Sequence, residues 1–249
     1  MTLSVIVITK NESKHLADCL DSVGFADEII VVDSGSSDDT CAIAASRGAK
    51  VTSTDDWPGF GPQKNRALDQ ATQDWVLSID ADERVTPELA IEIQAELVRP
   101  RAEAYKVARL SNFCGRWIRH SGWWPDHVVR LFKRGTARFN NVAVHESLQT
   151  AGPVLVLESH LLHYPYPDID SLLVKINRYS TDAATMMYAQ GERAGVMKAA
   201  GHAAWTFFRI YIIRRGFLDG REGFVLAAAG AAGNFFRYSK LMFMSRQNK

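Results

Sequence analysis

The segment Leu3-Ser-Val-Ile-Val-Ile-Thr-Lys-Asn-Glu12 begins as a run of β-branched apolar residues and ends in polar ones. Short runs of this kind are typical of strands that are buried on both faces of a parallel sheet. A helix-compatible segment follows at residues 13–23, and a second apolar run, Glu28-Ile-Ile-Val-Val32, comes after it. This order predicts a strand, a crossover helix and a second, parallel strand.

The alternation of strands and helices continues through the first 100 residues or so. Further strands are expected at Lys50-Val-Thr52 and Trp75-Val-Leu-Ser-Ile79, and further helices at residues 41–47, at residues 65–71 and after the start signal Thr86-Pro87. The whole order predicts an α/β, Rossmann-like fold with a mostly parallel sheet and helices on both faces.

The second half of the chain has a different pattern. Residues 104–162 favour shorter strands and aromatic loops. Residues from 168 onward are almost entirely helix-like, with breaks near Gly191, Gly195 and Gly216. We therefore expect an α/β domain at residues 1–167 and a helical region at residues 168–249.

Composition and missing motifs exclude several classes of protein. Three cysteines among 249 residues, without paired or metal-type spacing, exclude a disulfide scaffold and a zinc ribbon. The net charge of +1 provides no field for general nucleic-acid binding, so we expect no nucleic-acid partner. The signatures of dinucleotide, P-loop and α/β-hydrolase sites are absent. The N-terminus does not resemble an export signal, which predicts a reducing, cytoplasmic setting.

Charged and aromatic residues are unevenly distributed along the chain. The segment from Ala199 to the end carries eight basic residues, two acidic residues and ten of the 25 aromatic residues. Aromatic residues and arginines interleave there, as in helices that lie on an anionic membrane surface. The alternative is that the aromatic residues pack onto the α/β domain while the arginines face solvent.

Polar residues follow three of the expected strands, at the edge where open parallel sheets bind ligands. Asp80-Ala-Asp82 comes directly after one strand, and its carboxylates either share a divalent cation or are simply solvated. Residues 9–12 and 33–36 end the first two strands, where they can contact a nucleoside or act only as helix caps. Residues 59–66 add a glycine loop and two cations at a helix start.

Together these segments resemble the nucleotide-sugar domain of family 2 glycosyltransferases, the inverting GT-A type. Three segments match in order and spacing: Ser4-Val-Ile-Val-Ile-Thr-Lys-Asn-Glu12, Ile30-Val-Val-Asp-Ser-Gly-Ser-Ser-Asp-Asp-Thr40 and Ser78-Ile-Asp-Ala-Asp-Glu83. Later segments resemble the bacterial branch that adds β-1,4-glucose to the lipopolysaccharide inner core. They are Gly122-Trp-Trp-Pro-Asp126, Val129-Arg-Leu-Phe132, Val144-His-Glu146, His163-Tyr164 and Gly216-Phe-Leu-Asp-Gly220. The resemblance implies a GT-A catalytic domain followed by the helical region.

The resemblance implies roles for residues at the donor end of the site. Glu12 and Asp33 would hold the uracil and ribose of a UDP-sugar. Thr9, Asn11 and Ser34 belong to the same matching segments and would line the nucleotide.

The resemblance also implies a metal-assisted diphosphate site. Lys64 would lie near the base or the diphosphate, and Asp80 by the ribose and the sugar. Asp82, together with Asp80, would ligate Mg²⁺ or Mn²⁺ on the diphosphate. His145 and His163 are both candidates for a third ligand, because imidazole tolerates Mn²⁺. We expect His163, because GT-A enzymes often supply a late histidine.

At the acceptor end, Asp126 is similar in placement to the family's general base. That base usually lies in an acidic doublet, but proline precedes Asp126 here, and Glu146 is the alternative base. Inverting transfer needs such a carboxylate to take the proton of the attacking hydroxyl. Of Trp123 and Trp124, we expect one to form a floor for an acceptor sugar and one to fill a core, with His145 on the acceptor side.

The function that the resemblance implies is a metal-dependent, inverting hexosyltransferase. It would move glucose from UDP-glucose onto a lipid-linked saccharide, such as the heptose of the lipopolysaccharide inner core. It would lie peripherally on the inner face of the bacterial inner membrane. Two alternatives stay open, namely a polyprenyl-phosphate glycosyltransferase and a non-catalytic module that binds a nucleotide or carbohydrate.

Overall fold

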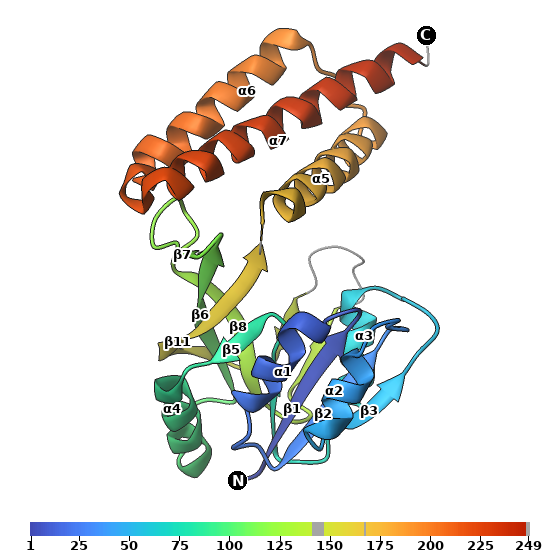
Figure 1. Ribbon diagram of the computed structural model, residues 1–249, viewed down its shortest axis with the longest axis vertical. Helices are drawn as coiled ribbons and strands as arrows, with labels where there is room; N and C mark the ends of the chain where they lie inside the picture. The colour runs from blue at the N-terminus through green and yellow to red at the C-terminus, as the bar shows by residue number, and fades with distance from the viewer. Residues whose placement is uncertain (141–146, 167, 248–249) are drawn as a thin grey trace. The chain divides into compact units, whose positions relative to one another are not determined.

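The computed structural model describes residues 1–140, 147–166 and 168–247, which belong to two compact units (Figure 1). The first unit comprises Met1–Arg109 and Asp126–His163, and the second comprises Leu110–Pro125 and Tyr164–Lys249. The second unit thus takes in residues 110–125, which lie inside the α/β domain expected from the sequence, and it resumes shortly before the expected helical region.

The first unit is built on a mixed sheet in the order β3-β2-β1-β4-β8-β6-β11-β5. Its four N-terminal strands are parallel neighbours, as the alternation of strands and helices predicts: β1 (Leu3–Thr9), β2 (Glu28–Asp33), β3 (Lys50–Ser53) and β4 (Trp75–Ser78). β8 (Asp126–Lys133) is antiparallel to β4 and to β6 (Ala104–Phe113), and β11 (Val154–Tyr166) is antiparallel to β5 (Glu83–Val85). The sheet is therefore parallel from β3 to β4 and continues with antiparallel pairs at β8 and β5.

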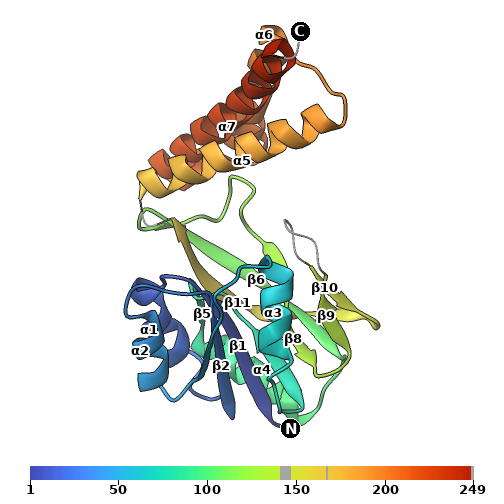
Figure 2. The same cartoon turned by 90° about the vertical axis from the view of Figure 1, so that its right-hand side faces the viewer.

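Helices cover both faces of this sheet, as the sequence predicted (Figure 2). One face packs against α1 (Ser13–Asp21), α2 (Thr40–Ser46) and α4 (Pro87–Val98), which share one hydrophobic core with the strands. The other face packs against α3 (Phe60–Leu68) and the hairpin of β9 (Ala137–Phe139) and β10 (Leu148–Thr150). The two cores bury the strands on both sides and leave their ends free to carry the site.

The second unit is mainly helical. α7 (Gly220–Gln247) packs along both α5 (Ile169–Ala189) and α6 (Val196–Phe208), and β7 (Arg116–Trp117) pairs with the end of β6. The predicted breaks are confirmed, because all three fall between these helices. A side chain at Gly223 would place its Cβ 1.9 Å from the carbonyl oxygen of Gly216, so only glycine allows this close approach. Among the described helices, none combines the length and apolar character needed to cross a membrane.

Candidate active site

The loops that follow β1 and β2 are tied together by Asp33. Thr9 and Asp33 are paired at the ends of these strands, and Thr9 Oγ1 donates to Asp33 Oδ1 at 2.8 Å. Ser36 donates its backbone N–H to Asp33 Oδ2 at 2.7 Å and its hydroxyl to Oδ1 at 2.5 Å. Burial by itself would raise the pKa of Asp33, but these hydrogen bonds outweigh it and hold the pKa below its usual value. Asp33 is therefore an ionised anchor that is 1% exposed.

Asn11 and Glu12 form further hydrogen bonds between the end of β1 and the segment that follows β2. Asn11 adopts a left-handed conformation with φ of 56°, which asparagine tolerates better than most residues. Its N–H donates to Ser36 Oγ at 2.7 Å, and its side-chain oxygen accepts from the N–H of Ser37 at 2.8 Å. The N–H of Glu12 donates to Thr40 Oγ1 at 2.8 Å. The serine-rich turn is thus held in one conformation by the protein itself.

α3 carries Gln63 and Lys64 to the same edge of the sheet. Gln63 is fully buried and donates to Ser34 Oγ at 3.0 Å, which joins α3 to the loop after β2. The Lys64 side chain is 4% exposed, and its Nζ lies 2.9 Å from Asp80 Oδ1. A buried ammonium group needs such a partner because it has lost its hydration. The structure therefore brings together two residues that the sequence assigned to the donor.

Asp80 lies between two cations. Its second oxygen, Oδ2, accepts from Arg130 Nη2 on β8 at 2.5 Å. Burial by itself would raise the pKa of Asp80, but the charges of Arg130 and Lys64 dominate and hold the pKa far below its usual value. Because each oxygen already binds a cation, a metal ion would compete with Arg130 and Lys64 for Asp80.

Arg130 connects Asp80 to a second carboxylate, Glu83. Arg130 Nη2 donates to Glu83 Oε1 at 2.5 Å, and Glu83 Oε2 accepts from the N–H of Asp80 at 3.0 Å. Arg109 on β6 reaches the same Oε1 through Nη1 at 3.3 Å. It also donates to Asp126 Oδ2 through Nε at 2.9 Å and Nη2 at 2.5 Å. We call the following six side chains, whose charges alternate in sign, the charge network: Lys64, Asp80, Arg130, Glu83, Arg109 and Asp126.

Asp82 and His163 form the pair best suited to a divalent cation. Asp82 Oδ2 lies 3.5 Å from His163 Nε2, and the two side chains are 26% and 14% exposed. Mg²⁺ prefers carboxylate oxygen, and Mn²⁺ accepts imidazole nitrogen as well. Within the described ranges, no cluster of three or more His, Cys, Asp or Glu side chains could hold a metal ion. The pair fits a cation that takes its remaining ligands from a diphosphate and water.

In the second unit, Asp219 fixes the loop at residues 119–121. Asp219 is 2% exposed, and its carboxylate accepts from the backbone N–H groups of Arg119 and His120 and from the hydroxyl of Ser121. These hydrogen bonds measure between 2.8 and 3.2 Å. Asp219 is the last residue of the segment Gly216–Asp219, which is part of the resembling segment Gly216-Phe-Leu-Asp-Gly220. It holds the loop at residues 119–121 in place, and we call this set of hydrogen bonds the Asp219 clamp.

Trp123 and Trp124 follow that loop and have different surroundings. Trp123 packs edge-on against Phe113, with ring centroids 6.1 Å apart, and lies 5.7 Å from Tyr166. It is partly buried and packs against a core of the second unit. The guanidinium carbon of Arg119 lies 5.9 Å from the ring of Trp124. Trp123 thus packs against a core, and Trp124 stays the candidate for contact with an acceptor sugar.

The predicted site residues are therefore divided among three places. Two candidates, the alternative base Glu146 and the acceptor-side His145, lie outside the described residues. Trp123 and Trp124 lie in the second unit. Lys64 lies on α3 and contacts Asp80. The remaining candidates lie at or next to the carboxyl ends of β1, β2 and β4 or on strands that continue this sheet: Thr9, Asn11, Glu12, Asp33, Ser34, Asp80, Asp82, Asp126 and His163.

Sequence reasoning assigned no role to Glu83, Arg109 and Arg130. Two of them lie in the quoted segments Ser78-Ile-Asp-Ala-Asp-Glu83 and Val129-Arg-Leu-Phe132. A charged residue inside an apolar strand segment is a signal of a buried ion pair, because a lone buried charge is costly. That signal was present at Arg130, but its partners come from distant parts of the chain.

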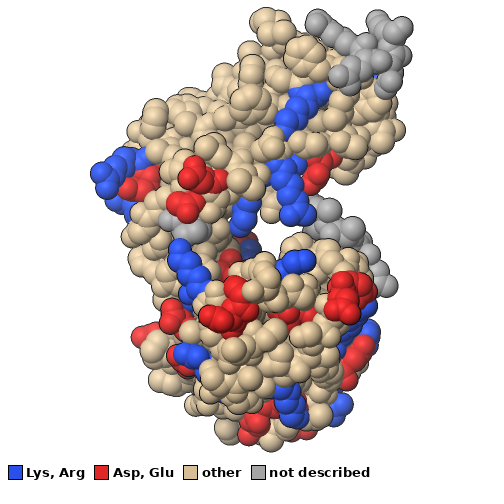
Figure 3. Space-filling view, turned by 45° about the vertical axis from the view of Figure 1, so that its right-hand side comes forward, with Lys and Arg blue, Asp and Glu red and all other residues tan. Residues whose placement is uncertain are grey.

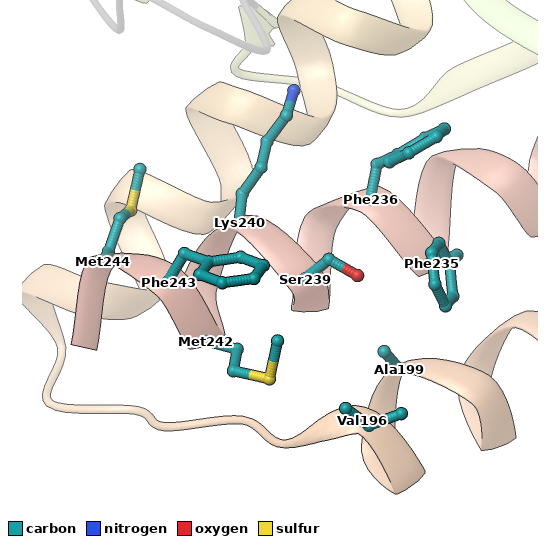
Figure 4. Close-up of a pocket in the computed structure, with 9 residues that line it drawn as sticks. All are labelled: Val196, Ala199, Phe235, Phe236, Ser239, Lys240, Met242, Phe243 and Met244. Carbon is teal, nitrogen blue, oxygen red and sulfur yellow. The ribbon is translucent and has the colours of Figure 1, made fainter. Parts of the chain in front are cut away.

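The second unit exposes most of the large apolar side chains that are exposed in the described chain. Trp205 and Phe224 are about half exposed, and the face of this unit seen in Figure 3 is largely uncharged. A cavity of about 570 Å³ lies between α6 and α7, where Phe235 and Met242 point toward Val196 (Figure 4). The second unit therefore offers apolar surface well beyond what its own core needs.

Comparison with known proteins identifies relatives along the whole chain. Residues 4–153 match Glycosyl transferase family 2. An uncharacterised glycosyltransferase of Rickettsia conorii, RC0292, is 34% identical over 99% of this chain and 92% of its own length. The lipopolysaccharide core biosynthesis glycosyltransferase LpsC of Rhizobium meliloti is 32% identical over 97% of this chain and 92% of its own length.

A solved structure shares the fold. The crystal structure of S. aureus TarS 1-349 in complex with UDP matches this chain with a TM-score of 0.53. The match covers all of this chain and 92% of that one, at 17% sequence identity. At that identity, the likeness establishes a common architecture.

Proposed function

This chain belongs to glycosyltransferase family 2 and has the GT-A fold of that family, and on this premise we propose a specific reaction for it. It transfers glucose from UDP-glucose, with inversion, to a lipid-linked saccharide such as the heptose of a lipopolysaccharide inner core. The observation that carries this proposal is the similarity to LpsC, a lipopolysaccharide core enzyme, along nearly the whole chain. Glycosyl transfer itself is the activity of the family.

The donor lies at the carboxyl edge of β1, β2 and β4. Glu12 and the loop held by Asp33 bind the uridine, with Thr9, Asn11 and Ser34 shaping that loop. This proposal is supported by the rigidity of the loop, whose hydrogen bonds leave little to reorganise when a nucleotide binds. Lys64 and Asp80 contact the diphosphate and the sugar.

A divalent cation, Mg²⁺ or Mn²⁺, is held by Asp82 and His163, with Asp80 beside them. When bound, the cation would neutralise the negative charge that develops on the departing diphosphate. The structure supports this proposal through the type of ligand atoms present. A carboxylate oxygen and an imidazole nitrogen lie 3.5 Å apart, and part of each side chain is exposed.

Asp126 is the general base. The hydroxyl oxygen of the acceptor forms a bond to the anomeric carbon while the bond from that carbon to the diphosphate oxygen breaks. The hydroxyl proton passes to Asp126, and UDP leaves with the bonding electrons. The Asp126 side chain is 43% exposed, so it is accessible to an incoming hydroxyl group.

A lipid-linked acceptor places the enzyme at a membrane, and the second unit has a surface suited to the inner leaflet. Phe208, Phe217 and Phe224 are each about half exposed. The neighbouring Arg214 and Arg215 are also exposed. Aromatic rings beside arginines favour the interface of anionic lipids.

The test is an assay of the purified protein with a panel of UDP-sugars and Mn²⁺. The acceptors are lipopolysaccharide that ends in heptose and, separately, a polyprenyl phosphate. We expect UDP-glucose to release UDP and the heptose-terminated acceptor to gain one hexose in mass analysis. Hexose on the polyprenyl phosphate instead would establish the alternative acceptor. UDP binding without release of UDP from any donor would indicate a binding module and overturn the proposal.

A further inference from the structure

We propose that Glu83 and Arg109 are positioning residues, which hold the proposed base Asp126 in a fixed place relative to the donor-side Asp80. This inference rests on the proposed function, because it assumes that Asp126 and Asp80 act on opposite ends of the reaction. Neither Glu83 nor Arg109 needs to touch the substrate for the proposal to hold.

The central member of the charge network is Glu83, which is fully buried. Its Oε1 accepts from Arg130 Nη2 at 2.5 Å and from Arg109 Nη1 at 3.3 Å, while its Oε2 accepts from the N–H of Asp80 at 3.0 Å. One carboxylate therefore fixes both arginines and the backbone of the Asp80 turn. Removing it would release the donor side and the acceptor side together.

Arg109 connects this centre to Asp126 alone. The two residues face each other across β6 and β8, and two nitrogens of Arg109 donate to Oδ2 of Asp126. Both hydrogen bonds end on the same oxygen, which leaves Oδ1 as the oxygen without a bond to Arg109. Arg109 thereby orients the carboxylate without occupying both of its oxygens.

The exposed fractions of the side chains in the charge network favour a positioning role over simple stabilisation of the fold. The interior members Glu83 and Arg130 are 0% and 6% exposed, while the carboxylates Asp80 and Asp126, which lie on either side of them, are 31% and 43% exposed. Within the described chain, Arg130 Nε is buried without a hydrogen-bond partner. A buried N–H without a partner reduces stability, and apolar residues often replace buried ion pairs without loss of stability. The network is better explained by where it places these two partly exposed carboxylates.

The two positioning residues predict different kinetic effects. Loss of Arg109 frees only the base, so kcat falls while the KM of the donor and the affinity for UDP stay the same. Loss of Glu83 frees the Asp80 turn as well, so kcat falls and the affinity for UDP weakens. A general loss of structure would instead lower the number of UDP-binding sites per protein molecule in both variants, which calorimetry measures separately from the affinity.

The test is a double-mutant cycle on UDP release from whichever of UDP-glucose, UDP-galactose and UDP-N-acetylglucosamine the wild-type protein turns over fastest. The variants are Arg109→Gln, Arg109→Lys, Asp126→Asn and the combination of Arg109→Gln with Asp126→Asn. Arg138→Gln is the matched control, because Arg138 is exposed and makes a similar pair with Asp69 in the same unit. UDP affinity is measured by calorimetry, with Glu83→Gln included.

We expect Arg109→Gln to lower kcat by about 10- to 100-fold, and Arg109→Lys to lower it less. In the Asp126→Asn background, Arg109→Gln should have no further effect, because the residue through which it acts is already gone. An equal further loss in that background, or wild-type kcat for Arg109→Gln, would overturn the positioning role. Wild-type turnover by Asp126→Asn would show that Asp126 is not the base and would overturn the positioning role with it, whereas no turnover of any donor would overturn the proposed function. If Glu83→Gln does not fold, the Arg109 cycle decides the question alone.

Discussion

Arg109 and Asp126 lie directly opposite each other on neighbouring antiparallel strands, and the guanidinium group binds a single oxygen of the carboxylate. Cross-strand neighbours have adjacent side chains, so the pairing of β6 with β8 creates this contact. A carboxylate held in this way keeps one orientation while its other oxygen can receive a proton. The sheet register therefore fixes the orientation of the proposed base.

Replacing Asp126 by Asn tests the base. The amide has the shape of the carboxylate but cannot take the proton of the attacking hydroxyl. We expect transfer to fall by about 100-fold or more while UDP binding stays at the wild-type level. Initial rates of UDP release and calorimetric titration of UDP measure the two quantities. Near-normal transfer would assign the base to Glu146.

Replacing Asp82 by Ala tests the cation site. UDP is titrated with and without Mn²⁺ into the wild-type and variant proteins. We expect Mn²⁺ to strengthen UDP binding to the wild type and to have no such effect on Asp82→Ala, because a hard oxygen ligand is missing. Asp69→Ala, an exposed carboxylate outside the site, serves as the control and should respond to Mn²⁺ like the wild type. Equal binding in all conditions would refute a metal-dependent donor site.

The lowered pKa of Glu28 predicts that the free energy of unfolding depends on pH. Burial by itself would raise its pKa, but hydrogen bonds from Lys50, Ser4 and Thr72 lower the pKa from 4.5 to about 2. Because the pKa is lower in the folded state, the stabilisation is complete above the unfolded pKa and is lost as the pH falls from 4.5 toward 2.

We therefore expect Glu28→Gln to lower the free energy of unfolding by about 1–3 kcal/mol at pH 7. The difference from the wild type should shrink as the pH falls through the acid range. Urea unfolding at a series of pH values measures both effects. Glu88, an exposed residue, supplies the control Glu88→Gln, which should shift stability by less than about 0.5 kcal/mol. A difference that stays constant with pH would contradict the assignment.

The aromatic surface of the second unit predicts binding to lipid vesicles. We expect the combined change of Phe208, Phe217 and Phe224 to Ser to weaken binding to anionic vesicles by about tenfold or more, because each ring contributes apolar area. Sedimentation of the protein with vesicles measures the partition. The control changes Ile91 and Val98, exposed apolar residues of α4, to Ser. An unchanged partition of the aromatic variant, with normal melting, would exclude this surface as the membrane contact.

The parallel half of the sheet could be predicted because β1, β2 and β4 are local apolar runs and helical segments separate the strands. The polar ends of β1, β2 and β4 could be predicted to lie together for the same reason, since parallel strands end at the same edge. The family resemblance assigned Lys64 and Asp80 to one site, and Lys64 Nζ lies 2.9 Å from Asp80 Oδ1.

The charge network could not be predicted in this way. Arg130 was visible as a charge within an apolar strand segment, but its contacts with Asp80 and Glu83 depend on the antiparallel pairing of β8 with β4 and β6. Strand pairing between distant segments is set by side-chain packing and closure of long loops, and a short pattern does not contain that information. The proposed roles of Glu83 and Arg109 therefore rest on contacts that become visible only when the strand register is known.

Asp219 has a consequence for the design of chimeras between this enzyme and its relatives. Its carboxylate holds the backbone of Arg119 and His120, almost one hundred residues earlier in the chain. The last helices and the loop that carries Trp124 therefore depend on each other structurally, even though they are far apart in the sequence. A chimera that imports only the C-terminal helices of a relative would break this clamp, whereas one that also imports residues 110–125 would keep it.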